Sequence, residues 1–142
     1  MMPDEKTASP PSLRFIGVVR STLKHKEDCP LQEFEGAPEA WIMIDGNYTD
    51  ALEGLKVGNE VILLSWLHLA DRNVLKCYPR NETHAPHVGV FNTRSPDRPN
   101  PIGLHTVTIL VIEHDKLKVH PLEALDGTFI VDIKPVIRSD RS

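Results

Sequence analysis

The sequence has few of the features that identify the common classes of enzyme. Its 142 residues include only two cysteines, Cys29 and Cys77, and no CxxC motif. We therefore expect two reduced thiols rather than a disulfide framework or a zinc site. It has no phosphate-binding GxxxxGK[ST] motif, no dinucleotide-binding glycine fingerprint and no GxSxG nucleophile elbow. Their absence argues against a P-loop nucleotide hydrolase, a Rossmann enzyme and a serine hydrolase.

Long apolar runs are also missing. No stretch approaches the roughly 20 apolar residues that span a bilayer, and the N-terminus has no apolar signal core, so we expect a cytoplasmic protein without a membrane partner. The formal net charge is -4, which argues against the broad basic surface of a general nucleic-acid binder. An RNA partner would have to contact a local basic patch.

Seven histidines raise the question of a metal site. The closest suggestive pair is His84 and His87, but Pro86 lies between them and argues against a shared helical face. No carboxylate or cysteine completes an obvious ligand set. We therefore expect no bound metal.

The residues that are present predict one mainly β domain. Its length fits a single domain, placed at residues 13–138 between polar tails at 1–12 and 139–142. Apolar and β-branched runs between turn residues predict short strands, with one short helix at 47–55 and a long loop at 22–38. The predicted strands are 15–19, 41–44, 59–67, 74–78, 87–91, 105–112, 116–120 and 128–133. This pattern is typical of a β-barrel or sandwich rather than of alternating βαβ units.

The most distinctive stretch is residues 89–104, GVFNTRSPDRPNPIGL. Three prolines restrict their own backbone and that of the preceding residue, so this stretch should form a rigid loop. Arg94 and Arg98 provide planar, permanently charged groups that suit a carboxylate or a phosphate. The alternative is a stiff turn with two solvated arginines.

Two other features have both a structural and a functional interpretation. The segment Asp126-Gly127-Thr128 precedes an apolar strand and is most simply a turn, but it could also present a carboxylate and backbone amides at a pocket rim. His68 follows the apolar strand 59–67 and is either a hydrogen-bonded structural histidine or a ligand group. Trp66, on the same strand, is either a core residue or a wall near a pocket.

Three segments together resemble one known family. GVFNTRSPDRPNPIGL is similar to the signature G-V-F-A-T-R-S-P-x-R-P-N-P-I-G of the TsaA-like family, also called YaeB, VirR or TrmO. The segment 125–135 resembles the second motif, D-G-T-P-x-x-D-I-K-P, and residues 16–21 resemble the opening I-G-x-I-x-S strand. The resemblance covers residues 13–137. Asn92 and Phe129 depart from the signature without removing a charged group.

The resemblance implies a single-domain β-barrel methyltransferase that depends on S-adenosylmethionine and lies outside the Rossmann class. It implies methylation of the exocyclic nitrogen of threonylcarbamoyladenosine, next to the anticodon of threonine tRNA, and a homodimer with the cofactor near the subunit junction. The cofactor contacts carried over by motif are Gln32, Glu33, Phe34, His68, Leu69, Arg94, Leu104, Leu125, Asp126, Gly127 and Thr128.

The same resemblance allows roles to be assigned as hypotheses. Arg94 would bind the methionine carboxylate of the cofactor or fix the neighbouring loops. His68 or Asp126 would be catalytic only if within hydrogen-bond reach of the acceptor nitrogen. Arg98, Lys24 and Lys26, with Arg20, would bind phosphates or the threonyl carboxylate of the substrate. The alternatives are a cofactor-binding regulatory module, a methyltransferase with another acceptor, and a β-barrel interaction domain that binds no cofactor.

Overall fold

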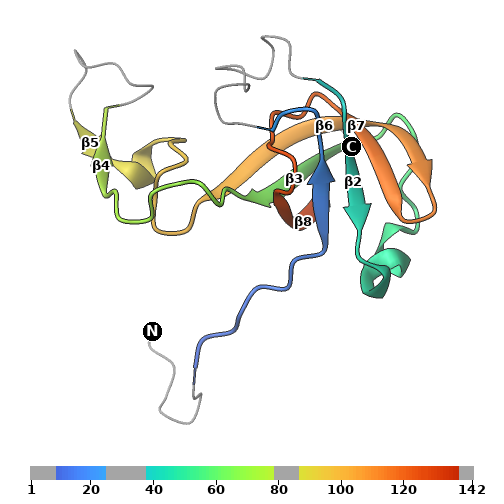
Figure 1. The fold of residues 1–142 in the computed structure, drawn as a ribbon, viewed down its shortest axis with the longest axis horizontal. Helices are drawn as coiled ribbons and strands as arrows, with labels where there is room; N and C mark the ends of the chain where they lie inside the picture. The colour runs from blue at the N-terminus through green and yellow to red at the C-terminus, as the bar shows by residue number, and fades with distance from the viewer. Residues whose placement is uncertain (1–8, 25–37, 79–86, 138–142) are drawn as a thin grey trace.

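The protein is a closed barrel of six antiparallel strands with a smaller two-stranded arm (Figure 1). The computed structural model describes residues 9–24, 38–78 and 87–137. Around the barrel the strand order is β1-β2-β7-β6-β3-β8, and β8 pairs with β1 to close it. The strands are β1 (Gly17–Arg20), β2 (Ala40–Ile44), β3 (Glu60–Trp66), β6 (Ile102–Glu113), β7 (Lys116–His120) and β8 (Phe129–Pro135). The predicted mainly β fold is confirmed, and the closed sheet is a barrel rather than a sandwich.

The barrel forms because its strands alternate between core-facing and outward residues. Val19, Ile42, Leu63, Ile109 and Leu117 come from five different strands and are completely buried. Burying a side chain of this size stabilises a protein by roughly 1.5–3 kcal/mol. The alternation therefore fixes which face of each strand points inward.

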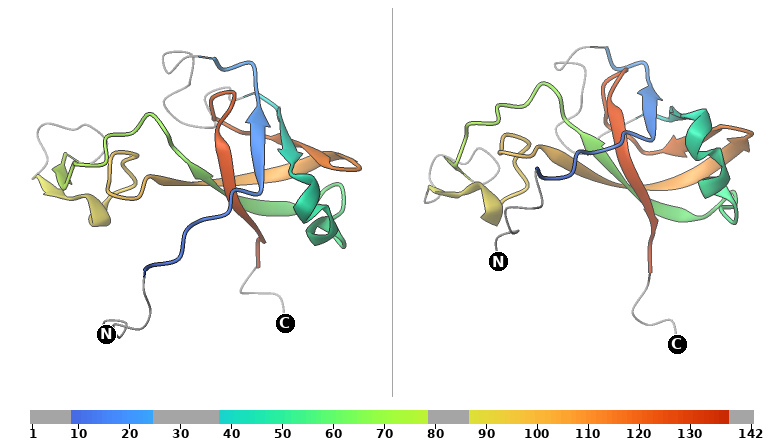
Figure 2. Two further views of the ribbon diagram at one scale, coloured as in Figure 1. Left: turned by 60° about the horizontal axis from the view of Figure 1, so that its bottom comes forward. Right: turned by 90° about the horizontal axis from the view of Figure 1, so that it is seen from below.

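The arm projects from one end of the barrel (Figures 1 and 2). It comprises residues 67–78 and 87–101, with strands β4 (Lys76–Cys77) and β5 (Val88–Gly89) and the 3-10 helix η4 (Val90–Asn92). The strands predicted at 74–78 and 87–91 are therefore only two residues long each. The cause is that β4 and β5 pair only with each other, and a two-stranded ribbon without a third strand is marginal.

The helix predicted at 47–55 is present as a 3-10 helix, η2 (Gly46–Leu52). Asp45 caps it by accepting a hydrogen bond from the Asn47 backbone N–H. Tyr48 and Leu52 pack against the core, so η2 covers part of the barrel.

Two strand predictions need correction. Strand β6 begins at Ile102 rather than at His105, because Gly103 and Leu104 pair with Ser65 and Leu64 of β3. The end of the 89–104 stretch is thus part of the barrel sheet. Although its nearly continuous apolar sequence is typical of a strand buried on both faces, β3 has only Val61, Leu63 and Ser65 buried, and its alternating apolar residues are half-exposed on the outer surface.

Parts of the predicted organisation lie outside the described residues. These are the segment 25–37 of the long loop, residues 1–8 of the first tail and the tail 139–142. Across the residues that the structure describes, no helix is long and apolar enough to cross a membrane. Cys77 is a free thiol, as predicted.

Candidate active site

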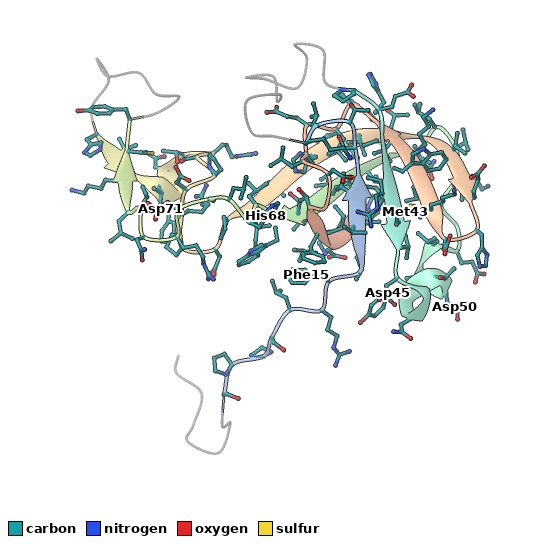
Figure 3. All side chains as sticks on the ribbon, viewed as in Figure 1. Phe15, Met43, Asp45, Asp50, His68 and Asp71 are labelled. Atoms are coloured by element: carbon teal, nitrogen blue, oxygen red, sulfur yellow. The ribbon has the colours of Figure 1, made fainter. Side chains whose placement is uncertain are left out.

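An open pocket of about 750 Å³ lies between the arm and the end of the barrel. This volume falls in the range of small-molecule and cofactor sites. Figure 3 shows His68 at the start of the arm, close to the end of β3. The pocket is lined by residues 67–70, 93–98, 102–105 and 123–125, with Phe91 and Thr128. Segments distant in the sequence, including the predicted 89–104 loop, therefore meet at one site.

The 89–104 loop is held by hydrogen bonds as well as by its prolines. The Arg98 guanidinium donates to the backbone carbonyls of Val90 at 2.7 Å, Ser95 at 2.9 Å and Thr93 at 3.1 Å. The Thr93 hydroxyl also donates to the Val90 carbonyl, at 2.8 Å. Arg98 is therefore tied to the loop's own backbone, which gives it a scaffold role.

Residues before β4 tie the loop from outside. Arg72 donates through Nε to the Pro99 carbonyl at 2.6 Å and through its second terminal nitrogen to Asn100 Oδ1 at 3.0 Å. The Asp97 carboxylate accepts the Asp71 backbone N–H at 2.9 Å. The Arg72 guanidinium also lies 5.0 Å from the centre of the Trp66 ring, on the barrel. The predicted rigidity thus has a second cause, a set of side-chain bonds between the loop, the start of the arm and the barrel.

Arg94 differs from Arg98 in its surroundings. It is exposed on the pocket wall, and its guanidinium makes no hydrogen bond or ion pair with the described parts of the chain. A cation on a rigid loop, with its donors still available, suits an anionic group of a ligand. Both arginines of the stretch line the pocket, but the Arg98 guanidinium is bound to the loop backbone, so Arg94 is the better candidate to bind a ligand.

Apolar side chains form much of the remaining wall. Leu69 is 57% exposed, Leu104 is 50% exposed and Phe91 is 85% exposed, and all three line the pocket together with Leu125. Large apolar side chains left in water at a pocket are typical of a ligand site. His68 and Leu69, which were predicted to be cofactor contacts, are both on this wall.

The barrel end of the pocket has a polar pair that the sequence predictions missed. His105 and Ser65 are buried, and His105 Nε2 lies 2.8 Å from Ser65 Oγ. Thr128, also buried, immediately precedes β8. An added Cβ at Gly103 would lie 2.7 Å from Ser65 Oγ and 3.0 Å from His105 Nε2. Because glycine has no Cβ, it leaves room at position 103 for the Ser65 and His105 side chains.

The missed pair had a signal in the sequence. His105 lies two and four residues before the buried Val107 and Ile109, on the same face of β6. Ser65 lies in the same way on the buried face of β3 that carries Val61 and Leu63, so each polar residue continues a buried face. Polar residues on the buried faces of two strands need partners. Pairing of the two strands supplies those partners.

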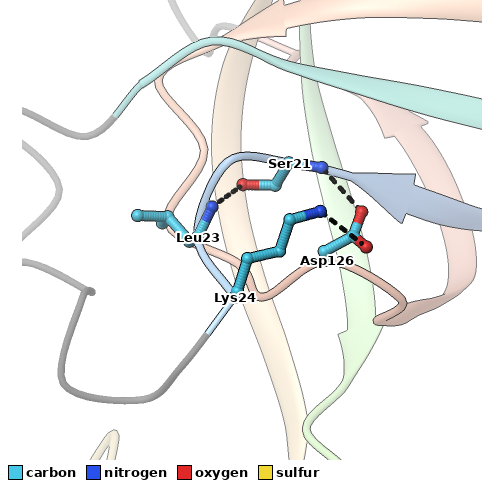
Figure 4. Close-up of polar contacts among 4 residues, drawn as sticks. All are labelled: Ser21, Leu23, Lys24 and Asp126. Atoms are coloured by element: carbon cyan, nitrogen blue, oxygen red, sulfur yellow. Dashed lines mark hydrogen bonds and ion pairs between the residues drawn. The ribbon is translucent and has the colours of Figure 1, made fainter.

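The Asp126 carboxylate is bound to the segment that follows β1. Asp126 Oδ1 accepts the Ser21 backbone N–H at 3.0 Å, and Oδ2 lies 3.0 Å from Lys24 Nζ (Figure 4). The Ser21 hydrogen bond is the main cause of a lowered pKa for the Asp126 carboxyl, and Lys24 adds to it. Gly127 adopts φ +89°, as a type II turn requires. The turn fastens the end of β1 to the start of β8.

The predicted site residues of the turn face two different cavities. Leu125 and Thr128 line the pocket, whereas the Asp126 carboxylate points to the Ser21–Lys24 corner and lines a second cavity. The position of Asp126 therefore gives no support to its predicted role as a proton acceptor. Lys24 is held by Asp126 rather than placed in the pocket. Gln32, Glu33, Phe34 and Lys26 lie outside the described residues.

Among the described residues, no group of three or more His, Cys, Asp or Glu side chains is arranged to hold a metal ion. The described pocket wall offers arginine, histidine and apolar side chains to a ligand.

Comparison with known proteins finds a family that this chain matches. The family described as tRNA-methyltransferase O N-terminal domain matches residues 18–140. A probable S-adenosyl-L-methionine-binding protein of Methanothermobacter thermautotrophicus is 45% identical over 123 residues, covering 87% of this chain and 88% of that protein. An S-adenosyl-L-methionine-binding protein of Archaeoglobus fulgidus is 43% identical over 122 residues, covering 86% of each.

Solved structures agree with the sequence relatives. The crystal structure of TrmO from Pseudomonas aeruginosa superposes with a TM-score of 0.73 at 30% identity, covering 94% of this chain. The match covers 60% of that protein's chain. The present chain thus spans about three fifths of the solved structure and most of the length of the two archaeal relatives.

Proposed function

The chain belongs to the family of tRNA-methyltransferase O N-terminal domains, and from this premise we propose that it is an S-adenosylmethionine-dependent methyltransferase acting on tRNA in the cytoplasm. The proposed acceptor is the exocyclic nitrogen of threonylcarbamoyladenosine, next to the anticodon of threonine tRNA. The observation that carries the proposal is Arg94, an exposed cation with available donors on a rigid loop at a cofactor-sized pocket.

The pocket residues fit S-adenosylmethionine. Arg94 would hold the carboxylate of the methionine part, because a guanidinium can bind both carboxylate oxygens at once. Leu69, Leu104 and Leu125 would contact the apolar surfaces of the cofactor and exclude water. When bound, the cofactor would supply a methyl group on a positively charged sulfonium, and an attacking nitrogen bonds to the methyl carbon as the neutral thioether leaves, which needs no metal. The chain's contribution is to orient the reactants, which can carry much of the rate.

The acceptor nitrogen must lose a proton as it gains the methyl group. We assign the proton to the imidazole of His68, which is exposed on the pocket wall, rather than to Asp126, whose carboxylate is bound at another corner. A positioned general base contributes about 100-fold or more to a rate. His68→Gln should therefore lower single-turnover methyl transfer by about that factor at saturating cofactor.

The functional unit is proposed to be a homodimer. Phe15, Trp66 and Phe129 form an aromatic group on the outside of the barrel, and the Phe15 and Phe129 rings stack with centroids 5.0 Å apart. Phe129 remains 47% exposed, and the neighbouring Ile102 and Leu104 are also exposed. Contiguous apolar surface of this kind supports a protein–protein contact, and its proximity to the pocket supports a cofactor site near the junction.

A second candidate function is a cofactor-binding regulatory module without transfer activity. Two features of the archaeal relatives favour it. They are named as binding proteins, and this chain covers 88% and 86% of their lengths. Such a module would bind S-adenosylmethionine through the same pocket but give no turnover.

One experiment separates these possibilities. Purified protein with methyl-labelled S-adenosylmethionine is incubated with threonine tRNA containing or lacking threonylcarbamoyladenosine, and nucleosides are analysed by mass spectrometry. Label on that nucleoside alone is the expected result. Cofactor binding by calorimetry without transfer to either tRNA would favour the regulatory module, and absence of cofactor binding would refute both.

A further inference from the structure

A second surface, on the outside of the barrel, combines an aromatic ring with cations. Arg20 of β1 is directly opposite Trp41 of β2, and Trp41 is directly opposite Lys118 of β7. These three residues, with Lys116 two positions from Lys118, are called the tryptophan row. Their neighbours along each strand are buried, so the row faces outward. Lys116 Nζ and Lys118 Nζ lie 5.1 and 5.9 Å from the centre of the Trp41 ring.

The row borders a cavity of about 400 Å³ whose lining residues differ from those of the candidate active site. Arg20, Trp41 and Lys118 line this cavity, as do Lys24 and Asp126. The link between the two cavities is the 125–128 turn: Asp126 faces the row, while Leu125 and Thr128 face the active-site pocket. A chain-like ligand could therefore cross this turn from one cavity to the other.

The simplest alternative is that the row consists of ordinary surface ion pairs. Lys118 lies 2.9 Å from Glu39, Lys116 lies 3.6 Å from Glu113, and Lys24 is paired with Asp126. Such exposed pairs are each worth only about 0–1 kcal/mol. Arg20, by contrast, makes no hydrogen bond or ion pair with the residues that the structure describes.

The local charge balance distinguishes this surface from the chain as a whole. Among the residues that the structure describes, four cations, Arg20, Lys24, Lys116 and Lys118, face the three carboxylates of their ion pairs, whereas the complete chain carries a net charge of -4. The weak pairs can be exchanged for phosphate without a large cost. The described part of this surface can therefore receive a polyanion.

We propose that the tryptophan row binds the single-stranded RNA next to the modified nucleotide. A base stacks on the Trp41 ring by displacing the Lys116 and Lys118 ammonium groups that lie over it, and these two lysines and Arg20 then contact phosphates. An aromatic platform flanked by cations is the common arrangement for single-stranded nucleic acid, because every base has a face that stacks and every linkage a charge. This inference rests on the proposed RNA substrate, and it places the flanking nucleotides across the 125–128 turn from the pocket.

The test uses the small number of tryptophans. Trp41 and Trp66 are the two in the chain, so Trp66→Phe leaves Trp41 as the sole indole. Titration with an unmodified RNA octamer of mixed sequence should quench its fluorescence saturably. If the Trp66 variant folds poorly, the natural protein can be titrated into a fluorescently labelled octamer of the same sequence. The fluorescence anisotropy of the octamer then gives the affinity independently.

The charge contribution is tested with matched double variants. Lys116→Gln with Lys118→Gln should weaken octamer binding about tenfold or more at low salt. It should also make the slope of log K against log salt shallower by about 1.4, because two phosphate contacts are lost on a single strand. The control is Lys56→Gln with Lys134→Gln, which removes two exposed lysines outside the row and should change neither quantity.

Three results would overturn the inference. The first is RNA binding without any change in Trp41 fluorescence. The second is an equal effect of the two double variants. The third is equal binding of poly-glutamate to the row, which would indicate an acidic protein segment instead. Calorimetry with S-adenosylmethionine on the same proteins separates this inference from the proposed function. Loss of cofactor binding with intact octamer binding would contradict only the function, whereas intact cofactor binding without octamer binding would contradict only the row.

Discussion

The two arginines of the 89–104 loop should respond in opposite ways to the same substitution. Arg98→Ala removes three hydrogen bonds to the backbone carbonyls of Val90, Thr93 and Ser95. Hydrogen bonds from a charged donor each contribute roughly 1.5–3 kcal/mol. The Val90 carbonyl keeps its bonds from Thr93, and the guanidinium is partly exposed. The expected loss of loop stability is therefore about 2–4 kcal/mol in total.

Hydrogen exchange monitored by mass spectrometry is the suitable assay, because the arm can open without unfolding the barrel. A loss of 2–4 kcal/mol corresponds to exchange about 30- to 700-fold faster for arm amides. Amides of β3 and β6 should change little. Arg98→Lys keeps the charge but cannot reach three carbonyls with a planar fork, so it should fall between Ala and the natural residue.

Arg94→Ala provides the opposite result. Since Arg94 has no bond to the described chain, arm exchange should stay unchanged, while S-adenosylmethionine affinity should fall by about 10- to 150-fold, the equivalent of 1.5–3 kcal/mol. Arg14→Ala, an exposed arginine outside the pocket, is the control. Equal exchange in the Arg98→Ala and natural proteins, or equally fast arm exchange in both alanine variants, would refute this division of roles.

The remaining predictions concern the barrel end, the turn and the outer face. Gly103→Ala should destabilise the protein by about 1–3 kcal/mol in urea unfolding through overpacking, because the new Cβ would lie 2.7 Å from Ser65 Oγ. The same substitution should cost less in a Ser65→Ala background, which lacks that oxygen. The control is Gly46→Ala, because position 46 has open space around it. Asp126→Asn should lower stability at pH 7. Because the folded-state pKa of Asp126 lies below its ordinary 3.8, the stabilisation by the charged carboxylate is complete above that value and is lost as pH falls through the lowered pKa. The gap between Asp126→Asn and the natural protein should therefore narrow in unfolding curves recorded below pH 4, and a constant gap would contradict the assignment. Phe129→Lys, at the exposed apolar face, should shift the proposed dimer to monomer in light scattering and cost about 0.5–1.5 kcal/mol of stability through the lost stacking on Phe15; an unchanged mass would exclude this face as the interface.

The sequence by itself determined the features that depend on neighbouring residues. Alternation of apolar residues predicted the barrel strands and hence a mainly β domain. The prolines of residues 89–104 predicted a rigid loop, and the Asp126-Gly127 pair predicted a turn, which Gly127 forms with φ +89°. The same local information over-extended the arm strands, because strand length depends on whether a pairing partner exists.

Only the tertiary structure decided what each polar side chain contacts. Arg94 and Arg98 have the same chemistry, lie four residues apart and both line the pocket, yet only Arg98 is hydrogen-bonded to the loop backbone in the described structure. His105 meets Ser65 across 40 residues of sequence, and Asp126 meets Ser21 across 105. These partners are set by strand register and by the closure of β8 on β1. Register and closure follow from the packing of the whole core, so no single stretch of the sequence contains them.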